Sequence, residues 1–470
     1  MTGVVAAPED QGVVEEYAPS PAGPLEDASG DWNLPPTPPL SPFIQTIRFG
    51  VRPLGFNFKA RKLLGEVFRV RIIGRDESFV VTCHPDHVKA LFTARPDQAP
   101  SMTGESPLRP VVGPNSVLTS IGERHMRQRK LLLPPFHGEA VRRYIGVIED
   151  AVAREIDRWK VGDAFALAPR MQAVTLDVIM AGVFGIEGRP APDSPEGRLR
   201  AGVRRSLAIS THPLWLLAEL HNVGRDEPRG AMKVALAYVD RLIYAAIDAR
   251  RREGREDTGD VLGLLLAARD EQGDPLGDRE LRDELLTLVL AGHETTANSL
   301  AWTFERLVRT PEPYARLREA VRDGDEEAGN AYVEATIHEG MRVRPVIPGV
   351  ARRVKVPWQL GEYRLPPNTP VAINIALLHH RPDIYPEPFA FRPERFLGRS
   401  PGTYTWVPFG GGIRRCLGAS LAMIEQQIVL RRMAERTELR AEDPRPELAR
   451  HRNVTMIPER GARVVLTAKS

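Results

Sequence analysis

The sequence predicts a mainly α-helical protein with small β-sheets, an α+β fold whose sheets lie toward the two ends of the chain. Apolar residues recur at helical spacing through the middle of the chain. Alternating and β-branched runs occur near residue 70 and again beyond residue 358. The chain has 470 residues, 42% of them hydrophobic, and no internal linker divides it. We therefore expect one large domain at 48–470.

The first residues differ in composition from the rest of the chain. Residues 1–31 are acidic and rich in Ala, Pro and Gly, which predicts a disordered tail. Residues 32–47 include the run WNLPPTPPLSP, whose prolines favour polyproline II. We interpret 32–47 as a Pro-rich lead-in to the folded domain.

Charge and cysteine content exclude several classes of protein. Seven of the 61 acidic residues and none of the 64 basic residues lie in 1–47, and the net charge is +3. A mild basic excess spread over a large domain does not indicate nucleic-acid binding, although it suits an acidic protein partner. Two cysteines exclude a disulfide framework. Without a signal-peptide pattern or a transmembrane stretch, we expect a soluble cytoplasmic protein.

The strand and helix signals follow a definite order. The runs 67–73 and 78–82 predict a β-hairpin that turns at 74–77. From about residue 86, apolar periodicity predicts helices at 123–132, 139–159, 171–184, 231–252, 260–269, 281–308 and 332–345. Further strands are predicted at 359–364, 370–375 and 463–466.

The segment FGGGIRRCLG, Phe409–Gly418, surrounds Cys416, and the only other cysteine is Cys83. Glycines allow positive φ and close approach to a flat ligand, and nearby arginines favour the thiolate. Apolar Phe409 and Leu417 would keep water from the sulfur. A thiolate on such a loop is a good iron ligand. The alternative is a Gly-rich turn around an ordinary buried cysteine.

The predicted helix at 281–308 contains LLTLVLAGHETTANSLAW, which is apolar nearly all round in its first half and should be buried. Glu294 and Thr295 are unusual in such a helix because burying a charge is costly. Gly292 leaves space for a small ligand, and Thr295 can bond to the carbonyl four residues back. Together, Gly292, Glu294 and Thr295 suit proton delivery to a bound small ligand. The alternative is a kink in a core helix.

Two further pairs of residues share a helix face. Glu339 and Arg342 are three apart, and Arg395 in FRPERFL could complete a buried ionic lock, although the spacing is common. His125 and Arg129 are four apart and could clamp a carboxylate or phosphate. A solvated basic face is the alternative for the second pair.

In order along the chain, AGHETT, EGMR, PERF and FGGGIRRCLG resemble the motifs of the cytochrome P-450 superfamily of heme-thiolate monooxygenases. The resemblance extends from about Trp32 to Leu466. Its most specific part is the pattern F-x-x-G-x-R-x-C-x-G around Cys416. The resemblance implies the fold of that family, with heme between a long distal helix and the proximal cysteine loop, and a monooxygenase activity.

The resemblance also implies roles for individual residues. Cys416 would be the axial ligand of the iron of heme b, and Thr295 with Glu294 would deliver protons. Arg352 would bind a heme propionate. Arg353 stands next to it in the sequence, so this role could belong to Arg353 instead. The implied cofactor-binding residues are His125, Arg129, Ala291, Gly292, Arg352, Phe409, Gly410, Arg414, Cys416 and Gly418. The implied structural lock is Glu339, Arg342 and Arg395.

The reaction implied by the resemblance inserts one oxygen atom of O2 into a small apolar substrate. Electrons would come from NAD(P)H through a ferredoxin reductase and a ferredoxin, which would dock near Arg127, Lys130 and Arg415. A peroxide-using heme-thiolate oxygenase and a non-catalytic heme-thiolate ligand-binding protein are the alternatives. The pair Glu294–Thr295 argues against the peroxide-using type.

Overall fold

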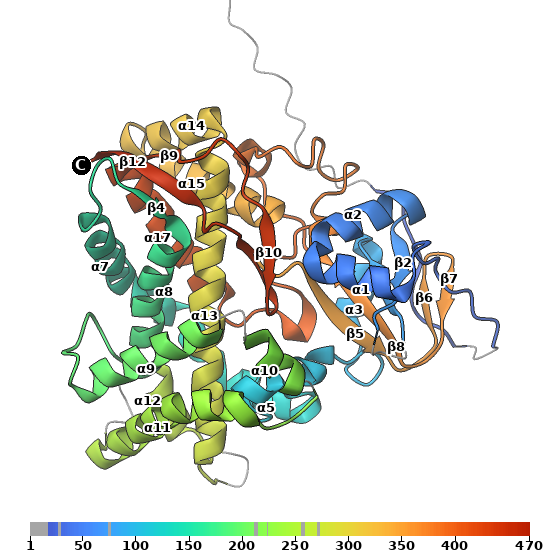
Figure 1. The fold of residues 1–470 in the computed structure, drawn as a ribbon, viewed down its shortest axis with the longest axis horizontal. Coiled ribbons are helices and arrows are strands. Elements are labelled where there is room, and N and C mark those ends of the chain that lie inside the picture. Colours follow the sequence, from blue (N-terminus) through green and yellow to red (C-terminus); the bar gives the residue numbers. More distant parts are fainter. Residues whose placement is uncertain are drawn as a thin grey trace, which may run out of the picture.

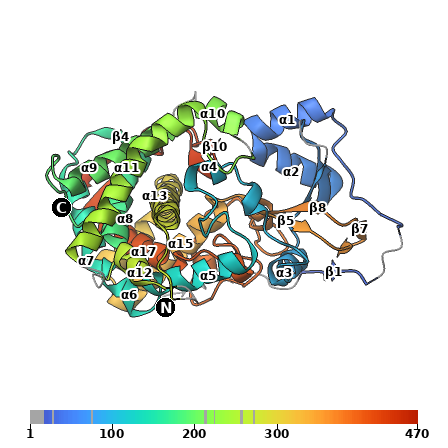
Figure 2. The same cartoon turned by 90° about the horizontal axis from the view of Figure 1, so that it is seen from below.

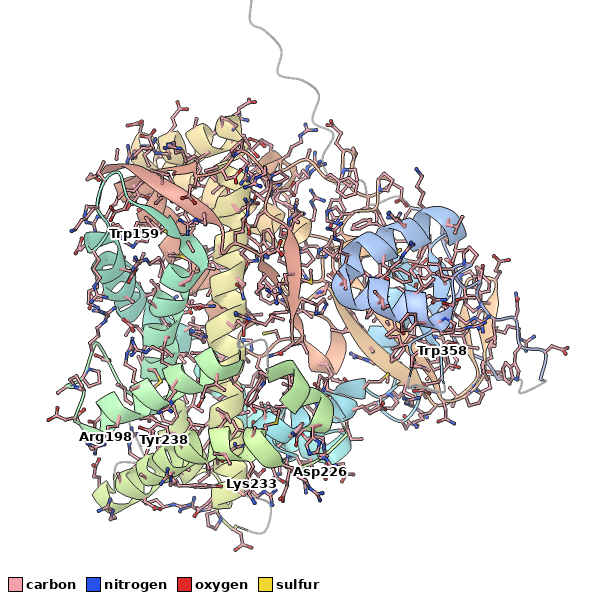
Figure 3. The ribbon with its side chains drawn as sticks, viewed as in Figure 1. Trp159, Arg198, Asp226, Lys233, Tyr238 and Trp358 are labelled. Atoms are coloured by element: carbon pink, nitrogen blue, oxygen red, sulfur yellow. The ribbon has the colours of Figure 1, made fainter. Side chains whose placement is uncertain are left out.

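The computed structural model describes residues 17–26, 30–73, 77–210, 215–222, 224–254, 259–269 and 273–470. Residues 1–16 of the predicted tail and 74–76 of the predicted hairpin turn lie outside these ranges. A large helical part and a smaller part that holds most of the strands lie side by side (Figure 1). Trp159 is buried in the core of the helical part, and Trp358 is buried in the second core (Figure 3).

The helical part is built around α13 (Asp278–Leu307), which runs through its centre and is seen end-on in Figure 2. Among the helices that pack against α13 are α8 (Leu167–Phe184), α15 (Glu326–Val343) and α17 (Ala419–Arg436). Around them lie α4 (Arg109–Val112), α5 (Gly122–Leu132), α6 (Glu139–Arg142), α7 (Tyr144–Asp157), α9 (Pro195–Ser210), α10 (Trp215–Asn222), α11 (Gly230–Glu253), α12 (Val261–Ala267) and α14 (Pro311–Arg322).

Local sequence explains several helix ends. Asp325 caps α15 by accepting a hydrogen bond from the Ala328 amide at 2.7 Å. Gly185 ends α8 in the left-handed conformation that glycine tolerates. Among the described residues, α8 is the one helix long and apolar enough to cross a membrane by composition. It packs against α7 and α13 with most of its length buried, as core helices do.

The smaller part contains a four-stranded sheet of order β2–β3–β8–β5, in which β3 and β8 are parallel. Beside it a second sheet has the order β1–β6–β7. The strands are β1 (Ala22–Pro24), β2 (Val67–Val70), β3 (Phe79–Thr82), β5 (Gly349–Val354), β6 (Trp358–Leu360), β7 (Tyr363–Leu365) and β8 (Thr369–Asn374). Helices α1 (Pro42–Val51), α2 (Pro53–Leu64), α3 (Pro85–Thr93) and α16 (Ile375–Leu378) accompany them.

The helical part carries two small sheets of its own. One has the order β4–β12–β9 and the other is the hairpin β10–β11. Their strands are β4 (Ala164–Ala166), β9 (Thr437–Ala441), β10 (Ala449–Arg452), β11 (Thr455–Pro458) and β12 (Arg463–Lys469). The described residues also contain four short 3-10 helices, η1 (Met102–Glu105), η2 (Pro134–Phe136), η3 (Pro393–Phe396) and η4 (Gly412–Arg414).

Several predicted boundaries were wrong. The helix expected at 139–159 is divided into α6 and α7, and the strand expected at 359–364 is a hairpin that turns at Gly361 with φ 61°. The predicted disordered tail includes β1, which is ordered because it pairs with β6. The predicted lead-in 32–47 already contains the start of α1, which Ser41 caps.

Candidate active site

The loop of Cys416 lies between η4 and the start of α17. Gly410 and Gly412 have φ of 67° and 62°, so two of the glycines supply the positive φ expected from the sequence. The Cys416 amide donates to the Phe409 carbonyl at 2.9 Å, which closes the turn. Gly418 stands at the N-cap of α17, and Cys416 is exposed. The loop therefore presents its cysteine instead of burying it.

The glycines of the cysteine loop also make room for Phe92 of α3. A Cβ atom at Gly411 would lie 2.3 Å from the Phe92 ring, and one at Gly412 would lie 2.0 Å from the Phe92 carbonyl oxygen. Such distances are impossible for a real side chain. The loop is thus packed against α3 from the smaller part of the molecule, a contact that the sequence did not reveal.

Electrostatics around the thiol favour the thiolate only in part. Desolvation by the surrounding protein raises the pKa of Cys416. A hydrogen bond from the Gly418 backbone and the charges of Arg129 and Arg415 lower it. Arg129 of α5 also donates to the Arg415 carbonyl at 2.7 Å, so the cation is fixed beside the cysteine loop.

Four cationic or basic side chains gather next to this loop: His125 and Arg129 of α5, Arg352 of β5 and Arg414. Within the described residues, none of the four lies within 4 Å of a carboxylate. Burial, together with the charges of Arg414, Arg129 and Arg352, lowers the pKa of His125 to about 4. Burial also lowers the pKa of Arg352 and of Arg414 to about 10.

This cluster, called the cation cluster below, has positive charge, and no carboxylate of the described residues balances it. His125 is 2% exposed and Arg352 is 6% exposed, so water screens them poorly. A ligand with two carboxylates would supply the missing charge. Heme b carries two propionates and binds thiolate through iron, so the cation cluster and Cys416 fit that cofactor together.

Arg352 and Arg353 are distinguished by their surroundings. Arg353 forms bidentate contacts with Glu77 at 2.7 Å and ion-pairs with Glu105 at 3.0 Å. Arg352 points to the other side of β5, 5.5 Å from the centre of the Phe92 ring. Of the two, only Arg352 belongs to the cation cluster.

Arg414 connects the cysteine loop with the segment before α5. It donates to the Val117 carbonyl at 3.1 Å and to the Ser120 carbonyl. The Val117 amide in turn donates to Glu284 of α13 at 2.9 Å. The segment that leads into α5 is therefore held between the cysteine loop and the central helix.

The helix α13 is buried along much of its length but is partly exposed at its centre. Residues 285–289 and 296–304 are buried, yet Ala291 between them is exposed. The Thr295 hydroxyl donates to the Ala291 carbonyl at 2.6 Å, as the sequence suggested. A Cβ at Gly292 would lie 2.6 Å from Cδ1 of Ile179 in α8. Gly292 therefore serves helix packing, and its missing side chain does not open space on the Ala291 face.

Glu294 is held by residues that the sequence did not single out. Its Oε1 atom accepts hydrogen bonds from Arg452 Nε at 2.7 Å and from the Thr455 hydroxyl at 3.2 Å. Both partners belong to the hairpin β10–β11, more than 150 residues away in the chain. No local sequence motif predicts this pairing, so the sequence gives no indication that Arg452 belongs to the site.

The residues of the predicted lock meet in the core. Arg342 makes a bidentate pair with Glu339 at 2.6 and 2.7 Å, and Arg395 Nε lies 3.4 Å from Glu339. The side chains of Glu339 and Arg342 have no exposed surface. Arg342 also donates to the His379, Pro388 and Ala390 carbonyls. The arrangement stiffens the region that precedes the cysteine loop.

Comparison with known proteins identifies the family of this chain. The Cytochrome P450 family matches residues 35–465. A Mycobacterium tuberculosis protein assigned as cytochrome P450 137 is 38% identical over 80% of this chain and 78% of its own length. Another from Mycobacterium bovis, cytochrome P450 138, is 35% identical over 92% of this chain and 97% of its own length. The retinoic acid-bound cyanobacterial CYP120A1 has the same fold, with TM-score 0.78, 24% identity, and coverage of 93% of this chain and 100% of that one.

The fold and the site define a heme-thiolate monooxygenase. The chain belongs to the cytochrome P450 family, and membership implies a heme cofactor.

Proposed function

We propose that residues 48–470 form a single monooxygenase domain that inserts one oxygen atom of O2 into a small apolar substrate in the cytoplasm. Electrons would come from NAD(P)H through a ferredoxin reductase and a ferredoxin. The observation that carries the proposal is the cation cluster beside an exposed cysteine, because together they match the propionates and iron of heme b. When bound, heme supplies the oxygen-activating chemistry.

The chain's own residues have separate tasks in this proposal. Cys416 would bind the heme iron through its thiolate, and the cation cluster with Phe409, Gly410 and Gly418 would hold the rest of the cofactor. Ala291 offers a small exposed surface on α13. The Thr295 hydroxyl donates a hydrogen bond to the Ala291 carbonyl. The oxygen of Thr295 can therefore accept a hydrogen bond from a ligand or water. Glu294 is the neighbouring acid of the proton path.

The absorption spectrum of the reduced, carbon monoxide-bound protein tests the ligation. Thiolate-ligated heme shows a strongly red-shifted Soret band. Cys416→Ser should abolish this band, whereas Cys83→Ser, which alters the buried cysteine, should leave it intact. A normal band in the Cys416 variant would refute the proposed ligand.

Uncoupling of oxygen reduction tests the proton path. Thr295→Ala should keep the heme spectrum but divert reducing equivalents to peroxide. Thr303→Ala is a matched control because Thr303 makes the same kind of bond, to the Ser299 carbonyl at 2.9 Å, two turns later in α13. Equal peroxide yields from the two variants would remove Thr295 from the proposal.

We propose a ferredoxin contact that keeps two of the three residues predicted from the sequence. Lys130 and Arg415 are exposed, but Arg127 forms an ion pair with Glu280, which occupies its charge. Charge reversal by Lys130→Glu and Arg415→Glu should slow reduction by an acidic ferredoxin and weaken its salt dependence. Lys59→Glu, on the exposed surface of α2, is the control. Unchanged reduction rates would exclude this surface.

A further inference from the structure

With two adjacent residues, the hairpin β10–β11 contacts both Glu294 of the candidate site and the helix α10. Arg452 ends β10 and Thr455 begins β11, and the two are directly paired across the strands. Asn453 lies in the two-residue turn between them, with φ 52°, a left-handed conformation that asparagine tolerates. A turn this tight leaves little freedom for Asn453 to move independently of Arg452.

On one side, the hairpin holds Glu294 of α13. Arg452 approaches Glu294 Oε1 with Nη2 at 2.5 Å and Nε at 2.7 Å. The two side chains are only 20% and 17% exposed, so their attraction is stronger than that of a surface pair. The Thr455 hydroxyl shares its single proton between the Arg452 carbonyl at 2.9 Å and the same Glu294 oxygen at 3.2 Å. The position of the Glu294 carboxylate is therefore set by the hairpin.

On the other side, the turn holds α10. With its amide oriented so that the nitrogen faces the acid, Asn453 donates to the two oxygens of Glu219 at 2.7 and 3.2 Å. Burial raises the pKa of Glu219, and a hydrogen bond from the Trp215 side chain lowers it. Glu219 and Trp215 are one helical turn apart, so this contact ties the hairpin to the body of α10.

The strand β11 is anchored independently of α10 at Met456, the residue after Thr455. The Trp302 indole of α13 donates to the Met456 carbonyl at 3.0 Å. The Met456 amide donates to the Val346 carbonyl at 2.7 Å. These bonds fix β11 against the core, whereas the turn end depends on its contacts with Glu294 and Glu219. The turn is therefore the part of the hairpin that can follow α10.

We propose that the β10–β11 hairpin couples α10 to the acid of the proton path, with Arg452 as the positioning residue for Glu294. The inference rests on the proposed function, in which Glu294 takes part in proton delivery. When α10 is in the position seen here, Asn453 is held and Arg452 keeps Glu294 oriented. Movement of α10 releases the turn and loosens the Arg452–Glu294 pair. By linkage, loss of that pair loosens α10 to the same extent.

Amide hydrogen exchange of the ferric, heme-loaded protein tests the coupling without turnover. Arg452→Met and Glu294→Gln both remove the ion pair without touching α10. Each should accelerate exchange in residues 215–222 by at least about threefold. Asn453→Gly removes the carboxamide but keeps the backbone conformation, and should have the same effect.

Matched controls separate coupling from general loosening. Arg450→Met changes an arginine of the same strand that forms no ion pair with a described carboxylate. Asn368→Gly makes the same substitution at another asparagine with positive φ, 68°. Neither should alter exchange in α10, and Arg452→Lys should restore most of the protection.

Normal exchange of α10 in both Arg452→Met and Glu294→Gln would overturn the coupling. If the combined variant Arg452→Met/Asn453→Gly showed fully additive effects, the two contacts would be independent and the proposal would also fail. A positioning role further predicts that Arg452→Met lowers product formed per NAD(P)H at an unchanged KM. A missing thiolate Soret band, in contrast, would refute the proposed function while leaving the exchange result valid.

Discussion

Arg352 and Arg353 are consecutive on β5 but face opposite surroundings. Arg353 is neutralised by Glu77 and Glu105, and Arg352 is buried beside Phe92 without a carboxylate. The alternation of side chains along a strand explains this division. A sequence alone could not tell which arginine belongs to the cation cluster, because the two differ only in the face of the strand they occupy.

The first prediction concerns this pair. Arg352→Met should lower the affinity of the protein for heme, since one cation of the cation cluster is lost. A charge-assisted hydrogen bond contributes about 1.5–3 kcal/mol, so the loss is on the order of tenfold to a hundredfold. Heme transfer to an apo-acceptor protein measures it. Arg353→Met should leave heme transfer unchanged, and a reversal of the two results would assign the cluster to Arg353.

The second prediction concerns Gly412. Gly412→Ala places a Cβ against the Phe92 carbonyl, a backbone atom that cannot turn aside, so the cysteine loop must shift. We expect loss of the thiolate Soret band. Gly398→Ala, at φ 66° with nothing within 4 Å, isolates the cost of the left-handed backbone, about 1–2 kcal/mol. Equal heme content in the two variants would show that the Phe92 contact is unimportant.

The third prediction concerns the lock. Arg342→Lys keeps the charge but loses the bidentate pair with Glu339 and contacts to three carbonyls. Each buried acceptor left without its donor costs about 1–3 kcal/mol, and several such losses are enough to prevent accumulation of folded protein. Arg392→Lys is the control, because Arg392 pairs at the surface with Glu387. Urea unfolding curves of the two variants would coincide if the lock were dispensable.

Strong periodicity made the long helices predictable. The ends of α8, α11 and α13 lie within a few residues of the expected ones, because each carries a continuous apolar face or core run. The start of α1 was missed although Ser41 followed by Pro42 is a cap signal, since the surrounding prolines suggested an extended lead-in.

The site was predictable only where its residues belong to local motifs. The contacts of Phe92 with the cysteine loop and of Arg452 with Glu294 join segments more than 150 residues apart. Neither α3 nor the hairpin has a distinctive composition. The strands of the hairpin β10–β11 are four residues each and show no clear alternation. Such contacts depend on how α3 and the hairpin pack, which one sequence does not specify.

The last prediction concerns His379, which is buried next to the lock. Its Nε2 accepts a hydrogen bond from the Val407 amide at 2.9 Å, just before the cysteine loop. Because an amide only donates, Nε2 must be unprotonated, and burial lowers the pKa of His379 to about 3. The unfolded chain, with a histidine pKa of about 6.5, therefore binds one more proton between these pH values. The contribution of neutral His379 to the free energy of unfolding is therefore fully present above about pH 6.5, and it decreases as the pH falls toward 3.

The contribution of His379 can be measured from unfolding at several pH values. The free energy of unfolding should decrease by about 1.4 kcal/mol per pH unit for this residue below pH 6. His379→Gln can still accept from Val407 but does not titrate, so its pH dependence should be shallower by about one proton. His137→Gln, at an exposed position, should keep the wild-type slope. Identical slopes for all three proteins would mean that His379 binds its proton equally well in the folded state, contrary to the hydrogen bond seen here.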